Sequence, residues 1–131
     1  MQQEKTRIVC NEIHKPFGNY SHGVLNNKTG LLVTSGQLGV GKDGHIPYSF
    51  SEQAELCFFN VSAIIEEAGF ELKDVMRVNT FLTARENFQE YMSVRDKFFE
   101  DVIIKPASTL LIVSGFTKPD FLIEVEVIAQ K

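Results

Sequence analysis

Residues 121–128 read FLIEVEVI, and the alternation in this stretch decides the fold class. Every second residue is apolar and shares one side of an extended chain: Phe121, Ile123, Val125 and Val127. The other side mixes two carboxylates with two apolar residues: Glu124, Glu126, Leu122 and Ile128. This pattern predicts a strand with one face toward a core and a second face that is only half polar.

Further strands and two helices are predicted upstream of this stretch. Strands are expected at 31–38, 75–82 and 109–113, each rich in β-formers. Ser49 and Glu52 form a capping box that opens a helix, and Gly69 closes it. Thr83 and Glu86 form a second capping box before another amphipathic helix. The order β-β-β-α-β-α-β-β predicts an α+β fold in which two helices cover one face of a mixed sheet of about six strands.

Composition limits the possible functions. The 131 residues are 44% hydrophobic and 23% charged, without a linker or repeat, so one domain over 1–131 is expected. A net charge of −4 does not favour nucleic-acid binding, and no apolar run reaches the ~18 residues of a membrane span. The two cysteines and three histidines lack metal-ligand spacing. We therefore expect a cytoplasmic protein without a metal or cofactor.

Residues 36–44 read GQLGVGKDG and nearly match two nucleotide-binding patterns. A phosphate cradle needs a helix directly after the glycines, because the helix N-terminus receives the phosphate. Here Pro47 intervenes, and Asp43 replaces the hydroxyl residue that would bind magnesium. Asp43 and Gly44 suit a tight turn, so the segment is interpreted as a turn.

Six stretches, in order and over about 16–129, carry a resemblance to a known family: GNYSHG, TSGQLG, EEAGFELKDV, VNTFLT, KPASTL and IEVEVIA. Together they resemble the Rid/YjgF family of reactive-intermediate deaminases. The resemblance implies a chorismate-mutase-like fold and a homotrimer whose three sheets close into a barrel, with a small-molecule pocket in each inter-subunit cleft. The bare second sheet face agrees with such an assembly, because Leu32, Leu38, Leu122 and Ile128 are expected there. A monomer with an open sheet is the alternative.

In this family, the best-known members hydrolyse 2-imino acids to 2-oxo acids with an arginine that clamps the carboxylate and a glutamate that positions water. Matched position by position, the resemblance places Tyr20, Ser35, Gly36, Gln37, Met92, Ser108 and Leu110 in the ligand pocket. Glu124 matches the water-positioning glutamate. Tyr20 and Glu124 also admit a purely structural reading, as do Met92 and Leu110. Arg77, Arg95 and Lys97 are interpreted as surface charges.

Ser108 stands at the position of the family's arginine, in PAST. A hydroxyl donates one neutral hydrogen bond, whereas a guanidinium donates two charge-assisted ones. The loss corresponds to about 2–4 kcal/mol of carboxylate binding. Lys105 is a candidate substitute cation, although its flexible stem lacks the fork geometry of arginine.

Three functions follow from these observations. The first is a homotrimeric small-molecule-binding protein with little or no 2-imino acid deaminase activity. The second is a 2-iminobutanoate/2-iminopropanoate deaminase in which another cation replaces the arginine. The third is a ribonuclease or translation inhibitor, which the sequence favours least because it shows no His/Lys constellation suited to phosphodiester cleavage.

Overall fold

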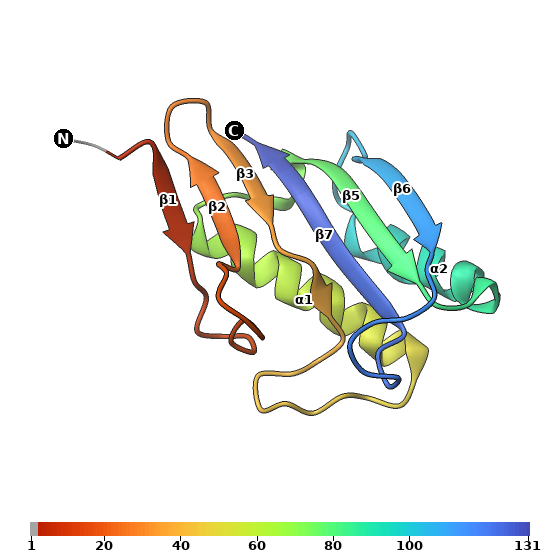
Figure 1. The fold of residues 1–131 in the computed structure, drawn as a ribbon. Helices are drawn as coiled ribbons and strands as arrows, with labels where there is room; N and C mark the ends of the chain where they lie inside the picture. Colours follow the sequence, from red (N-terminus) through yellow and green to blue (C-terminus); the bar gives the residue numbers. More distant parts are fainter. Residues whose placement is uncertain (1–2) are drawn as a thin grey trace.

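A mixed sheet lies against two α-helices in the computed structural model, which describes residues 3–131 (Figure 1). Within these residues the strands are β1 (Lys5–Ile8), β2 (Gly23–Asn26), β3 (Leu31–Thr34), β4 (Gln37–Leu38), β5 (Val75–Leu82), β6 (Ala107–Ile112) and β7 (Ile123–Gln130). The helices are α1 (Phe50–Glu67) and α2 (Phe88–Phe98), with short 3₁₀ turns at Leu72–Asp74 and Arg85–Asn87. The predicted α+β fold with two helices is confirmed.

Strand β7 lies in the middle of the sheet. The strand order is β1-β2-β3-β7-β5-β6, and β4 also pairs with β7. The side chains of Ile123, Val125, Val127 and Ala129 are completely buried, which confirms the predicted alternation. The strand begins two residues later than expected, so Phe121 precedes it and packs in a smaller cluster with Leu38 and Val40. Only β5 and β6 run parallel, and α2 makes the crossover between them.

Helix α1 follows the predicted boundaries closely. Ser49 Oγ accepts a hydrogen bond from the Glu52 amide at 3.4 Å, and Gly69 ends the helix with φ of 83°. The second predicted capping box is wrong. A 3₁₀ turn begins after Ala84, and α2 starts at Phe88 without a side-chain cap.

The predicted strand over 31–38 is two strands, β3 and β4, separated by Ser35 and Gly36. Both pair with β7, so the break shifts the chain locally without leaving the sheet. The glycine-rich segment that follows is a turn, as expected. Gly44 has φ of 92°, its amide donates to the Gly41 carbonyl at 2.9 Å, and α1 begins only at Phe50.

The apolar residues expected on the sheet face opposite the helices are confirmed only in part: Ile128 lies there and pairs with Val33, whereas Leu122 packs against the main core. Leu32 lies in the main core and is completely buried, because it pairs with Ala129 on the helix-covered side. Leu38 does lie on the side of Glu124, but the smaller cluster buries it. Leu31, Val33 and Leu111 are the exposed apolar residues, with 37%, 39% and 54% of their surface accessible.

In the part of the chain that the structure describes, no helix is long and apolar enough to cross a membrane.

Gln53 of α1 joins two loops to the helix from a buried position. Its amide nitrogen donates to the carbonyls of Pro47 at 2.9 Å and Asp120 at 2.8 Å. Its oxygen accepts from the Leu122 amide at 3.0 Å. One side chain thus satisfies three backbone groups at the start of α1 and just before β7.

We predict that Gln53→Met lowers the free energy of unfolding by about 2–4 kcal/mol, because these backbone groups lose their partners while the volume is kept. Urea denaturation followed by circular dichroism measures the change. Gln89→Met, at an exposed position of α2, is the control and should stay within about 0.5 kcal/mol of wild type. A similar loss in both variants would contradict this role of Gln53.

Candidate functional site

The residues expected in the ligand pocket fall into two groups on one chain. Tyr20, Gly36 and Gln37 line one hollow between the N-terminal loop and β4, and Glu124 lies beside Gly36. Ser108 lines a second hollow between α2 and β6. Val78 of β5 pairs with Ser108, whereas Phe81 of β5 pairs with Glu124. An offset of three residues along a strand places Ser108 and Glu124 on opposite faces of the sheet.

Glu124 lies directly against the backbone of Gly36. A Cβ atom at position 36 would be 2.6 Å from the Glu124 Cδ atom, so any larger residue there would force this carboxyl group to move. Burial, followed by repulsion from nearby Glu126, raises the pKa of Glu124 above its ordinary value. Among the residues that the structure describes, none hydrogen-bonds or pairs with this carboxylate. A half-buried carboxyl group with a raised pKa is suited to hold a water or to exchange a proton.

Backbone contacts fix the loops around Glu124. Ser35 Oγ donates to the Ser21 carbonyl at 2.6 Å, and the Ser35 amide donates to the His22 carbonyl at 2.9 Å. Gln37 is buried and pairs with Val125. The Tyr20 hydroxyl accepts from the Phe17 amide at 3.1 Å, while 42% of the residue's surface stays accessible. These contacts place Tyr20 and Gly36 near Glu124, and their contact with a ligand remains a prediction.

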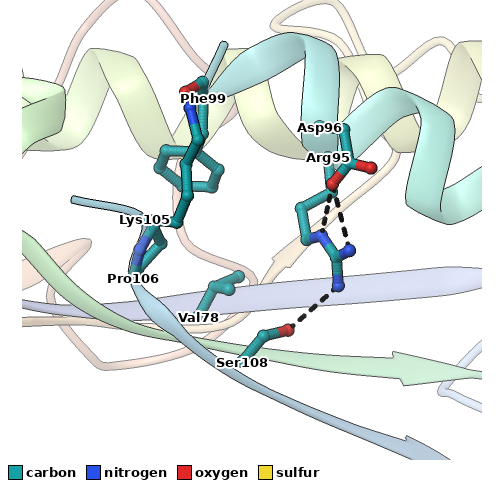
Figure 2. A pocket seen from close by; sticks show the side chains of 7 residues that line it. All are labelled: Val78, Arg95, Asp96, Phe99, Lys105, Pro106 and Ser108. Carbon is teal, nitrogen blue, oxygen red and sulfur yellow. Dashed lines mark hydrogen bonds and ion pairs between the residues drawn. The ribbon is translucent and has the colours of Figure 1, made fainter. Parts of the chain in front are cut away.

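The second hollow is a pocket of about 250 Å³ between α2 and β6. Figure 2 shows the residues that line it: Val78, Arg95, Asp96, Phe99, Lys105, Pro106 and Ser108. Arg95 Nη1 donates to Ser108 Oγ at 3.3 Å, so a guanidinium reaches the residue that the resemblance matches to the family's arginine. The interpretation of Arg95 as a plain surface charge is wrong, because only 24% of its side chain is exposed.

Two neighbours hold the Arg95 guanidinium in place. The Asp96 Oδ1 atom accepts from Nε at 3.1 Å and from Nη2 at 3.0 Å. The guanidinium also lies over the Tyr91 ring, whose centroid is 5.7 Å from the guanidinium carbon. The sequence contained a signal for this residue. Met92 and Arg95 are three residues apart on α2 and therefore share a helix face.

Lys105 has a structural task instead. Its Nζ atom donates to the carbonyls of Phe99 at 2.8 Å, Glu100 at 3.1 Å and Val102 at 2.6 Å. These carbonyls lie at the end of α2 and in the turn after it, where a cation is favourable. All three N–H donors of the ammonium group are engaged, so Lys105 is not placed to clamp a ligand.

Met92 and Leu110 are half-buried and pack against the main core. Neither lines the pocket in Figure 2, and their contact with a ligand remains a prediction. Across residues 3–131, no three His, Cys, Asp or Glu side chains come together to hold a metal ion.

The raised pKa of Glu124 predicts a pH-dependent stability. A raised folded-state pKa means that ionisation of Glu124 opposes folding. The contribution of the protonated form is fully present below about pH 4.3, the unfolded value, and is lost as the pH rises through the folded pKa. We therefore expect Glu124→Gln to raise the melting temperature more at pH 8 than at pH 4. Calorimetry at both pH values tests this, with the exposed Glu12→Gln as the control. An equal effect of Glu124→Gln at both values would contradict the expectation.

Comparison with known proteins identifies the family and agrees with the fold. The family model described as endoribonuclease L-PSP matches residues 11–131. A RutC family protein of Aquifex aeolicus is 34% identical over 88% of this chain and 91% of its own length. The 2-iminobutanoate/2-iminopropanoate deaminase of Escherichia coli K12 is 34% identical over 86% of this chain and 88% of its own. The crystal structure of E. coli TdcF with bound serine superimposes with a TM-score of 0.89 at 28% identity, covering 96% of this chain and 98% of that one. The chain therefore belongs to the endoribonuclease L-PSP family, the Rid/YjgF family that its sequence resembles.

Proposed function

We propose that the protein is a homotrimer that binds a small molecule in each inter-subunit cleft. The separation of the expected site into two groups supports this proposal most strongly. One chain holds Glu124 on the open face of its sheet and Ser108 on the helix-covered face near an edge strand. Cyclic assembly would place the β6 edge of one subunit beside the Glu124 face of the next and complete a pocket between them. The exposed Leu31, Val33 and Leu111 on the open face also favour burial in an assembly.

The proposed ligand is small and is bound rather than rapidly hydrolysed. Ser108 offers a neutral hydroxyl where a 2-imino acid deaminase of this family would hold the substrate carboxylate with arginine. Glu124 remains in place with a raised pKa and is suited to position water. Correct placement of substrate and water supplies much of the rate acceleration in such hydrolyses. A substrate whose carboxylate is held in a different position therefore loses more in turnover than in binding. We therefore propose little or no 2-imino acid deaminase activity.

Deaminase activity is the second candidate, and two observations favour it. Arg95 brings a guanidinium to Ser108, and a relative at 34% identity is a 2-iminobutanoate/2-iminopropanoate deaminase. Ribonuclease activity has weaker support. His22 is buried, with its Nδ1 accepting from the Cys10 amide at 3.0 Å and its Nε2 facing the His14 carbonyl at 2.9 Å. It is therefore not available as a general base.

The proposed assembly predicts a particle of about 44 kDa, three chains of 14.8 kDa. Light scattering coupled to gel filtration measures this mass at micromolar concentration. Leu111→Asp, on the open face, should weaken the assembly because it introduces a charge into the proposed interface. Glu12→Asp is a control at an exposed loop position and should leave the mass unchanged. A monomeric wild type would exclude the inter-subunit pocket.

The proposed chemistry predicts that wild type hydrolyses 2-iminobutanoate little faster than buffer does. Moving the guanidinium from α2 to β6 with Arg95→Met and Ser108→Arg together should raise the rate. Ser108→Arg alone should gain less, because two guanidinium groups would then repel each other within hydrogen-bonding distance. Semicarbazone formation from an imine generated in situ measures the rates, and adding Glu124→Ala to the double variant should abolish the gain. Rapid hydrolysis by wild type would exclude the binding-only function and favour the deaminase.

A further inference from the structure

We propose that Arg95 is the anion anchor of the pocket between α2 and β6, and that the pocket takes a small monocarboxylate. This inference rests on the proposed function, because it assigns the class of ligand and the residue that recognises it. The sequence pattern assigned no role to Arg95, and the position expected to hold the cation carries Ser108. The structure shows that the cation is supplied from the helix instead of the strand (Figure 2).

The guanidinium keeps two donors for a ligand. Arginine has five N–H donors, and three of them are engaged: Nε and one on Nη2 with Asp96, and one on Nη1 with Ser108. One N–H remains on each terminal nitrogen. Two donors on neighbouring nitrogens match the spacing of the two oxygens of a carboxylate.

Ser108 adds a third donor at the same place. Its Oγ atom accepts the hydrogen bond from Arg95 Nη1, so its own hydroxyl proton can be donated to the neighbouring Tyr91 hydroxyl or to a ligand. The serine therefore orients the guanidinium and can also bind an anion beside it. This arrangement explains why a hydroxyl residue is useful at position 108.

The charges around the pocket favour an anion. Arg95 and Lys105 line it together with a single carboxylate, that of Asp96. Asp96 is 70% exposed, so its attraction for Arg95 is screened by solvent and leaves the guanidinium able to attract a ligand. Val78, Phe99 and Pro106 form the apolar part of the wall. Reduced contact with water strengthens the interaction between the partly buried guanidinium and a bound carboxylate.

The pocket also limits the size of the ligand. Its volume of about 250 Å³ admits a short-chain acid, and its wall places apolar groups beside the guanidinium. An acid with one carboxylate and a short apolar tail can pair with the guanidinium and contact the apolar wall at the same time. A second carboxylate would lie against the apolar wall without a partner, which is unfavourable.

The test titrates 2-oxobutanoate into the intact protein and follows binding by NMR and calorimetry. Wild type should show saturable binding with a change in the Arg95 Nε–H resonance. Arg95→Met should weaken binding roughly tenfold or more, because charge-assisted hydrogen bonds are lost, and Arg95→Lys should fall between. Arg85→Met, at an exposed position before α2, is the matched control and should bind like wild type. The methyl ester of 2-oxobutanoate should bind more weakly than the acid to wild type, and equally to wild type and Arg95→Met.

Three results would overturn the assignment: unchanged binding by Arg95→Met, equal binding of the acid and its ester by wild type, or no binding of either. Melting temperature and trimer mass show whether each variant is folded. If Arg95→Met does not fold, the Arg95 Nε–H resonance of wild type decides, and its insensitivity to saturating acid overturns the proposal. The mass of wild type tests the proposed assembly separately. If wild type is a trimer but does not bind 2-oxobutanoate, the role of Arg95 is contradicted while the proposed assembly stands.

Discussion

The structure depends on the alternation of side chains along β7. Ile123, Val125, Val127 and Ala129 are completely buried on one face, and this requirement places the helices on that side. The same alternation sends Glu124 and Glu126 to the face without helices, where no positive side chain among residues 3–131 pairs with them. Burial of Glu124, followed by repulsion from Glu126 two residues away on the same face, raises the pKa of Glu124. The packing pattern of one strand thus produces both the core and the most perturbed acidic group near the expected site.

Local patterns predicted the elements, whereas contacts between distant residues decided the details that were missed. Strands β5 and β7 and helix α1 could be located because their periodicity and end signals are local. The break between β3 and β4 could not be located in this way, since Gly36 at the break contacts Glu124, which lies on a strand 88 residues later in the chain. For the same reason Leu32 was expected on the wrong face, while Leu38 lies on the expected face but is buried. That break changes which residues face the core, and the predicted strand ran through it.

The substitute cation could not be chosen from sequence alone. Lys105 was the candidate from sequence, and it lies three residues from Ser108 in the chain, whereas Arg95 lies thirteen away. In three dimensions the lysine turns back to three carbonyl groups at the end of α2, which lack partners within the helix. Because Lys105 is held there, the side chain that contacts Ser108 is Arg95 of α2. The capping of α2 and the position of the Arg95 guanidinium are thus two results of the same packing between α2 and β6.

Placing the cation on the helix has a different consequence from placing it on the strand. An arginine at 108 would project from β6, whereas Arg95 spans the gap from α2 and ends at the Ser108 hydroxyl. An anion held by Arg95 would therefore bind in the pocket between helix and strand, and its reacting carbon would be displaced from the position that an arginine on β6 would give. Binding tolerates such a displacement, because the carboxylate keeps its charge-assisted hydrogen bonds. Attack by water does not tolerate this displacement, because a shift of the reacting carbon by about 1 Å lowers the rate roughly a hundredfold. On this argument, supplying the positive charge from the helix instead of the strand would favour binding over hydrolysis, as the proposed function requires.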